Sequence, residues 1–123
     1  MTLVLGCGGS GGGGADYAPT SISGVTANGT IISGSGDYAS SGTYTLTFTA
    51  STFVLTGGAG VADDTGTYVY TRNSGTSGTI EGTRSAGGLT TIVITFSSAT
   101  TGSYVATGSL GISGTQTGTF TGF

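Results

Sequence analysis

Large apolar residues alternate with small β-branched ones through much of this chain. In segment 43–49 a threonine flanks every large residue, and segments 67–71 and 91–96 repeat the pattern with threonine or valine. A period of two is typical of a strand with one buried face. No segment carries the 3.6-residue period of a helix, and 27 glycines disfavour helix throughout. The pattern predicts an all-β protein.

A glycine, then threonine or serine, then a large residue recurs at a spacing of 12 residues or a multiple of it. The motif begins at Gly42, Gly66, Gly78 and Gly102. Twelve residues accommodate one strand of about seven residues and a turn, the spacing of an antiparallel meander. Glycine-containing turn sequences separate the expected strands, and Asn28-Gly29 is interpreted as the first of these turns.

A second period, of 24 residues, distinguishes alternate units. Two unlike strands per repeat form a hairpin, and eight units from Thr30 onward make about four hairpins. The fifth position of the units shows the difference: Leu46, Tyr70 and Ile94 alternate with Gly34, Gly58, Gly82 and Ala106.

Closure of the meander into a barrel is the expected architecture, because a single flat sheet would leave its apolar face in water. The 28 Ile, Leu, Val, Phe and Tyr residues after Cys7 are few for a sandwich and enough for one small barrel. Glycine-rich alternate strands permit the tight coiling that this needs. We predict a single antiparallel up-and-down meander of about eight strands over residues 21–123, forming a small closed or nearly closed barrel. The residues expected to point inward are Tyr44, Leu46, Phe48, Tyr68, Tyr70, Ile80, Ile92, Ile94, Phe96, Tyr104 and Phe120.

The hairpin rhythm from Ser41 to Phe123 resembles the small lipocalin-like (calycin-type) barrels of bacterial secreted proteins. The resemblance covers about two thirds of the chain and rests on rhythm, without a signature motif. It implies an up-and-down barrel with ligand access at one open end.

The first residues resemble a bacterial lipobox. In Leu3-Val4-Leu5-Gly6-Cys7 an apolar residue stands three before the cysteine and a small residue directly before it. The resemblance implies that Cys7 receives a diacylglyceryl group and becomes the acylated N-terminus after cleavage. Only six residues, none basic, precede Cys7, whereas a signal peptide has a charged region and about 7–15 apolar residues. We therefore interpret 1–6 as a truncated signal-peptide remnant; the alternative is a free cysteine in a flexible tail.

Residues 8–14 are six glycines and one serine, a composition typical of a flexible coil. Such a run spans very roughly 15 Å. A phosphate-binding glycine loop would lie between a strand and a helix and usually bring a lysine, neither of which is expected here. Residues 7–20 are therefore predicted to be a lipidated cysteine and a Gly-rich tether.

Composition excludes several classes of function. The chain has no His, no Lys, one Cys and two Arg, with a net charge of −3. A serine nucleophile lacks its usual base, a cysteine cluster cannot form, and two arginines make no basic patch. We expect no enzyme activity, no metal, no cofactor and no nucleic-acid binding. Asp63-Asp64 is interpreted as a turn, with a weak calcium site as the alternative, and Glu81 lacks the partner that glycoside hydrolysis requires.

The two arginines are the candidate charged ligand contacts. Arg72 and Arg84 share the seventh position of their units, so both are candidates for one barrel mouth, where they would orient an anionic group. The alternative is that both end their strands in solvent. The full set of candidate ligand-lining residues is Tyr44, Phe48, Tyr68, Tyr70, Arg72, Arg84 and Tyr104.

Together these observations predict a non-catalytic bacterial cell-envelope lipoprotein, held in the periplasm or on the cell surface by lipid on Cys7. Its barrel would bind a small apolar or anionic molecule or serve as a structural surface module. The alternative is an adhesive or self-assembling coat protein, because so few charges give little repulsion between copies. The terminal Phe123 and the threonine rows leave an outer-membrane barrel and an ice-binding protein as minor alternatives.

Overall fold

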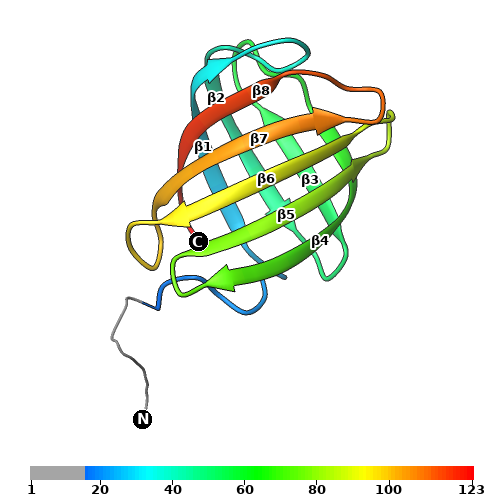
Figure 1. Cartoon of the computed structure of the whole chain (residues 1–123). Helices are drawn as coiled ribbons and strands as arrows, with labels where there is room; N and C mark the ends of the chain where they lie inside the picture. Colours follow the sequence, from blue (N-terminus) through cyan, green and yellow to red (C-terminus); the bar gives the residue numbers. More distant parts are fainter. Residues whose placement is uncertain (1–15) are drawn as a thin grey trace.

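A computed structural model describes residues 16–123, which form a closed barrel of eight antiparallel strands (Figure 1). Each strand pairs with the next along the chain, and the last pairs with the first. The predicted all-β up-and-down barrel is confirmed. Cys7 and the glycine run of the expected tether lie outside the described residues. The strands are β1 (Thr26–Gly34), β2 (Gly42–Phe48), β3 (Thr52–Gly57), β4 (Asp64–Ser74), β5 (Ser77–Arg84), β6 (Leu89–Phe96), β7 (Gly102–Ser109) and β8 (Thr115–Thr121).

The connections divide between two ends of the barrel. We call one end the mouth; it carries the β1–β2, β3–β4, β5–β6 and β7–β8 loops. The other end, the base, carries the β2–β3, β4–β5 and β6–β7 turns, the segment 16–25 before β1 and the C-terminus. In Figure 1 the mouth is at the top and the base at the bottom.

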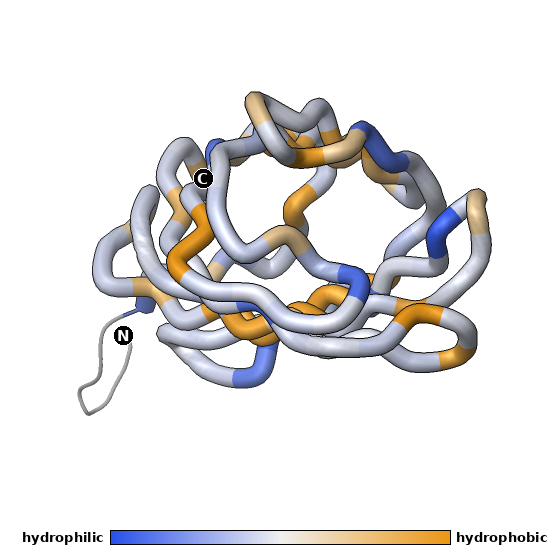
Figure 2. Tube along the Cα trace, turned by 90° about the horizontal axis from the view of Figure 1, so that it is seen from above, coloured by the Kyte–Doolittle hydropathy of each residue, from blue (hydrophilic) through white to orange (hydrophobic). Residues whose placement is uncertain are grey.

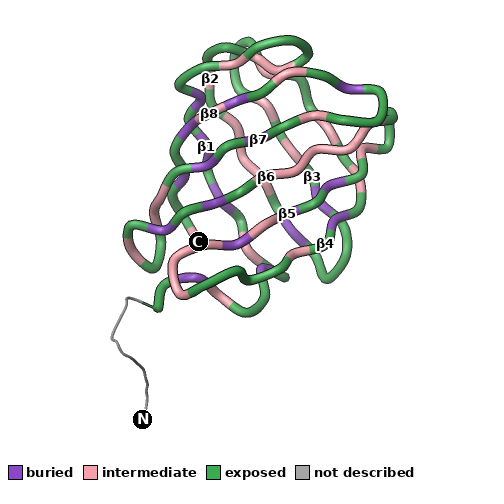
Figure 3. The backbone as a smooth tube through the Cα atoms, in the orientation of Figure 1, coloured by how far each residue is buried: buried purple, intermediate pink, exposed green. Residues whose placement is uncertain are grey.

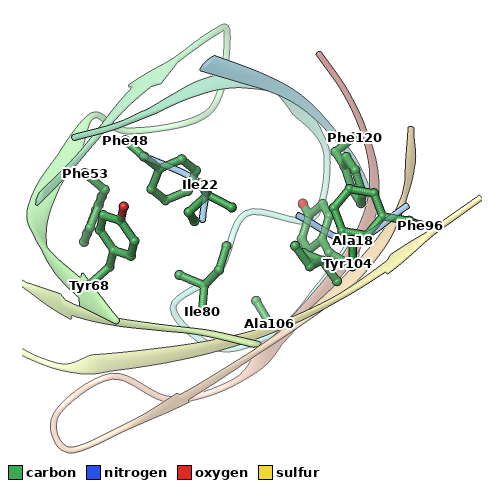
Figure 4. Packing of buried hydrophobic residues seen from close by; sticks show 11 residues of the cluster. Ala18, Ile22, Phe48, Phe53, Tyr68, Ile80, Phe96, Tyr104, Ala106 and Phe120 are labelled. Carbon is green, nitrogen blue, oxygen red and sulfur yellow. The ribbon is translucent and has the colours of Figure 1, made fainter. Parts of the chain in front are cut away.

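The apolar positions of the strands are the buried ones, as the alternation predicts (Figure 3). Figure 4 shows core side chains from β2 to β8 gathered inside the barrel. All eleven residues predicted to point inward either belong to the buried core or pack against it from half-buried positions. Threonines and valines occupy the alternate, outward positions. The buried core cluster consists of Ala18, Ile22, Phe48, Phe53, Tyr68, Ile80, Ile94, Phe96, Tyr104, Ala106 and Phe120.

Inward aromatic rings lie over glycines of neighbouring strands. Tyr44 pairs with Gly29, where an added Cβ would lie 2.3 Å from the ring carbon Cζ. Tyr104 pairs with Gly118, whose added Cβ would lie 2.6 Å from the ring carbon Cε1. Each ring therefore occupies the space of two side-chain positions, and only glycine leaves that space free.

The predicted turn at Asn28-Gly29 is wrong, because both residues lie within β1. Gly29 pairs with Tyr44 on one side and with Phe120 on the other. Its φ is not among the positive values that turn glycines such as Gly36 and Gly60 adopt. Gly29 is required for the close approach of a ring and not for a turn conformation.

The segment 16–25 closes the base of the barrel. Ile22 is only 1% exposed and packs with Ala18 into the core cluster (Figure 4). Two strand side chains hold its backbone: the Tyr70 hydroxyl donates to the Pro19 carbonyl (2.8 Å) and Arg72 Nε donates to the Ala18 carbonyl (2.9 Å). Ala18 and Pro19 fall within the span expected for the tether, yet Ala18 is part of the packed core.

The ring-on-glycine packing predicts unequal effects of two similar substitutions. Gly118→Ala places a Cβ 2.3 Å from the Thr30 carbonyl oxygen and against the Tyr104 ring, so we expect a loss of about 1–3 kcal/mol in the free energy of unfolding. In the control Gly82→Ala the nearest atom, in Phe53, is 3.3 Å away, and we expect a change within about 1 kcal/mol. Urea unfolding measures both; equal losses would contradict the packing argument.

Candidate functional site

A cavity of about 410 Å³ lies inside the barrel and is lined by residues from the loops at the mouth down to Phe48 and Phe53 near the base. Figure 2 looks onto the mouth end of the barrel and shows the ring that the strands form. Ligand sites typically begin at about 300 Å³, so the volume is sufficient for a small organic molecule. The base is closed by segment 16–25, and the cavity therefore has one end at which a ligand can enter.

One side of the cavity wall is apolar. It is built from inward side chains of β2, β3, β5 and β6, which the alternation of each strand turns toward the barrel axis. Such a wall binds the apolar body of a ligand by removing its surface from water. The side chains are Leu46, Phe48, Phe53, Leu55, Ile80 and Ile92.

The opposite side carries a chain of hydrogen bonds. The Tyr104 hydroxyl on β7 donates to Gln116 Oε1 on β8 at 2.8 Å. Gln116 Nε2 in turn donates to the Ala39 carbonyl at 3.0 Å. Gln116 is only 9% exposed, so these two bonds meet the requirement that a buried amide be satisfied. Gln116 is also one of the residues that line the cavity.

The β1–β2 loop lies across part of the mouth. The Tyr38 hydroxyl and Thr90 Oγ1 of β6 are 2.8 Å apart, within hydrogen-bond distance. Asp37 Oδ2 accepts a hydrogen bond from the Ser113 amide in the β7–β8 loop at 2.8 Å. With the Gln116–Ala39 contact, these bonds hold the loop against three other parts of the rim.

The two arginines lie at opposite ends of the barrel, so the hypothesis that they share one mouth is wrong. In the β4–β5 hairpin Arg84 pairs with Gly66, whereas Arg72 pairs with Gly78. Because successive strands run antiparallel, the same position in successive units falls at opposite ends. Arg84 lies at the mouth, where its Nε is 2.5 Å from Asp64 Oδ2. Arg72 lies at the base and forms an ion pair with Asp16.

The structure divides the predicted ligand-lining residues into two groups. Tyr44, Phe48, Arg84 and Tyr104 line the cavity. The other three turn to the base: the Tyr68 hydroxyl donates to the Thr49 carbonyl, while Tyr70 and Arg72 hold the segment before β1.

Sequence reasoning missed Tyr38, Leu55, Thr90 and Gln116, which also line the cavity. Gln116 carried a usable signal, because it is the one glutamine of the chain and stands at an inward position between threonines. The position of Tyr38 depends on the conformation of a loop and had no comparable signal.

Burial alters the acidity of the tyrosines inside the barrel. The pKa of Tyr44 is raised strongly, first by burial and then by the neighbouring Tyr104 hydroxyl. Burial also raises the pKa of Tyr104, although a hydrogen bond from Tyr44 opposes the shift. The two rings meet edge to face with centroids 6.2 Å apart. Both hydroxyls are therefore neutral hydrogen-bonding groups at physiological pH.

Asp63 and Asp64, at the start of β4, each make a structural contact. Asp63 Oδ1 accepts a hydrogen bond from the Gly57 amide at 2.8 Å, and Asp64 pairs with Arg84.

Within residues 16–123 no three His, Cys, Asp or Glu side chains are arranged to hold a metal ion. Nor does that part of the chain contain a helix long and apolar enough to span a membrane.

Comparisons of the chain with protein families, with curated proteins and with solved structures found no match.

The raised tyrosine pKa values predict loss of stability in alkali. Above the unfolded tyrosine pKa of 10.0 the unfolded chain releases protons that the folded barrel retains, so the free energy of unfolding falls as pH rises further. Tyr44→Phe removes one such group while keeping a ring over Gly29. We expect its stability to fall less steeply than that of the wild type in urea unfolding between about pH 9 and 11. If the free energy of unfolding falls equally steeply with pH in both proteins, Tyr44 is excluded as a cause of the loss of stability in alkali.

Proposed function

We propose that this protein is a non-catalytic bacterial cell-envelope lipoprotein whose barrel binds a small molecule with an apolar body. The observation that carries the proposal is the cavity of about 410 Å³, open at the mouth and closed at the base. A barrel that served only as a structural module would need no such space, because its own side chains could fill the interior.

The composition of the cavity wall supports binding. Most of its side chains are apolar, and a few polar groups, including Thr90, Tyr104 and Gln116, stand at fixed positions. This combination is typical of small-molecule sites, in which burial of apolar surface gives affinity and convergent hydrogen bonds give orientation. The same wall offers no activated nucleophile, since the chain has neither His nor Lys to act as a base.

The cell-envelope location rests on the sequence of the first residues. The lipobox-like segment ending at Cys7, followed by a glycine run, supports a lipid anchor with a spacer before the folded domain. The module would then stand in the periplasm or on the cell surface, where the lipocalin-like arrangement of one open end suits capture of a diffusing molecule.

A second candidate function is favoured by the outer surface. Among outward strand positions in the described part of the chain, Glu81 is the one charged residue, and the others are mainly threonine with exposed valines such as Val69 and Val105. Such a surface gives little repulsion between copies, which suits an adhesive or self-assembling coat protein. Sedimentation over a range of concentrations distinguishes this alternative, because a monomer at high concentration argues against it.

Two neighbouring residues of β6 provide a matched test of binding. Ile92 lines the cavity, whereas Val93 points outward and is 42% exposed. Ile92→Trp fills the cavity, so we expect at least about a tenfold loss of affinity for the neutral apolar dye N-phenyl-naphthylamine, on the scale of one lost buried side chain. Val93→Trp should bind like the wild type. The measurement is dye fluorescence during titration; absent binding to the wild type, or equal binding by both variants, would contradict a ligand site in the cavity.

The lipid anchor is tested separately. The gene with its natural start, expressed in a bacterial host supplied with labelled fatty acid, should yield labelled protein in the membrane fraction. Cys7→Ser should abolish the label and release the protein, because the acylated sulfur is lost, whereas Ser10→Ala in the same region should change neither. An unlabelled wild type, or an unchanged membrane fraction for Cys7→Ser, would exclude the anchor.

A further inference from the structure

We propose that the cavity selects ligands carrying a protonated amine at the mouth end of an apolar body and discriminates against carboxylates. This inference rests on the proposed binding function and adds the charge of the ligand. It arises from the distribution of charged side chains around the cavity, which the sequence could not assign.

The charges lining the cavity are unbalanced. Asp37, Asp63 and Asp64 contribute three carboxylates, and Arg84 contributes the one guanidinium. All four lie at the mouth, on or beside the β1–β2 loop, the β3–β4 loop and the end of β5. With the carboxylates ionised, the entrance carries a net charge of −2, which attracts a cation and repels an anion.

Arg84 is already paired with a carboxylate. Its Nε donates to Asp64 Oδ2 at 2.5 Å, and both side chains are largely covered, at 27% and 19% exposed. A carboxylate ligand would have to share the guanidinium with Asp64, and two carboxylates in close contact repel each other. Arg72 offers no substitute, because it is engaged with Asp16 and Ala18 at the base.

The interior of the cavity requires the charged group of the ligand to stay at the mouth. Below the rim the wall consists of apolar side chains such as Leu46 and Ile80 together with neutral hydroxyl and amide groups. Burying an ammonium there without a carboxylate partner would be costly. At the rim the same ammonium is attracted by the carboxylates of Asp37 and Asp63, which line the cavity there. The apolar body then fills the space between β2, β3, β5 and β6.

Three probes with the same eight-carbon chain separate charge from apolar burial: octylamine, octanol and octanoate. Each displaces N-phenyl-naphthylamine from the wild-type protein at neutral pH. We expect octylamine to bind most tightly and octanoate least, with about a threefold to tenfold difference between them at low salt. The difference should narrow as salt is added, because screening weakens charge interactions at the exposed rim.

Removing single charges identifies the carboxylates that cause the preference for an amine. Asp37→Asn and Asp63→Asn each keep an oxygen that can accept the existing amide hydrogen bond while removing the charge. We expect each to lower octylamine affinity by about twofold to fivefold and to leave octanol affinity unchanged. Asp16→Asn is the matched control, since it removes the same charge at the base, beside Arg72, and should leave both affinities unchanged.

The outcomes separate the charge preference from the proposed function. If neither the dye nor any probe binds, the cavity is no binding site and both proposals fail. If octanol binds and octanoate binds as tightly as octylamine, the binding function stands and the charge preference is wrong. If Asp16→Asn lowers octylamine affinity as much as Asp63→Asn, the effect belongs to the net charge of the protein and the assignment to the mouth is wrong.

Discussion

The contact on which this barrel depends is an aromatic ring lying over a glycine of the neighbouring strand. Tyr44 over Gly29 and Tyr104 over Gly118 each cover two inward positions with one side chain, which helps a chain poor in large residues to pack its interior. Both tyrosine rings also line the cavity, together with small inward residues such as Ala106. The ring-on-glycine contacts therefore contribute both to the packed interior and to the wall of the cavity.

Alternation and the 12-residue period were sufficient to predict the number, direction and inward faces of the strands, because both depend on neighbours close in sequence. The role of Gly29 was not predictable in the same way. Asn28-Gly29 is locally a turn sequence, and what decides its conformation is a tyrosine 15 residues later that the hairpin register brings opposite it. A single sequence does not distinguish a glycine that makes room for a ring from a glycine that allows a turn.

The candidate site was predictable only in part, for a geometric reason. Sequence position identifies which side chains face inward, but the end of the barrel at which each lies follows from strand direction, which reverses between Arg72 and Arg84. The closing of the base by Ala18 and Ile22, and the reach of the β1–β2 loop to Thr90 and Gln116, depend on irregular backbone that carries no periodic signal. Those two irregular segments determine where the cavity ends and how it is entered.

The position of segment 16–25 determines which way the mouth of the barrel faces when the protein is attached to a surface. It approaches the barrel at the base, and the C-terminal Phe123 packs against Phe96 and Phe120 at that same end (Figure 1). Attachment through either end of the folded domain, to a bilayer, a bead or a fused partner, therefore directs the mouth away from the attachment point. A molecule entering the cavity would arrive from the surrounding solution and not from the surface to which the protein is fixed.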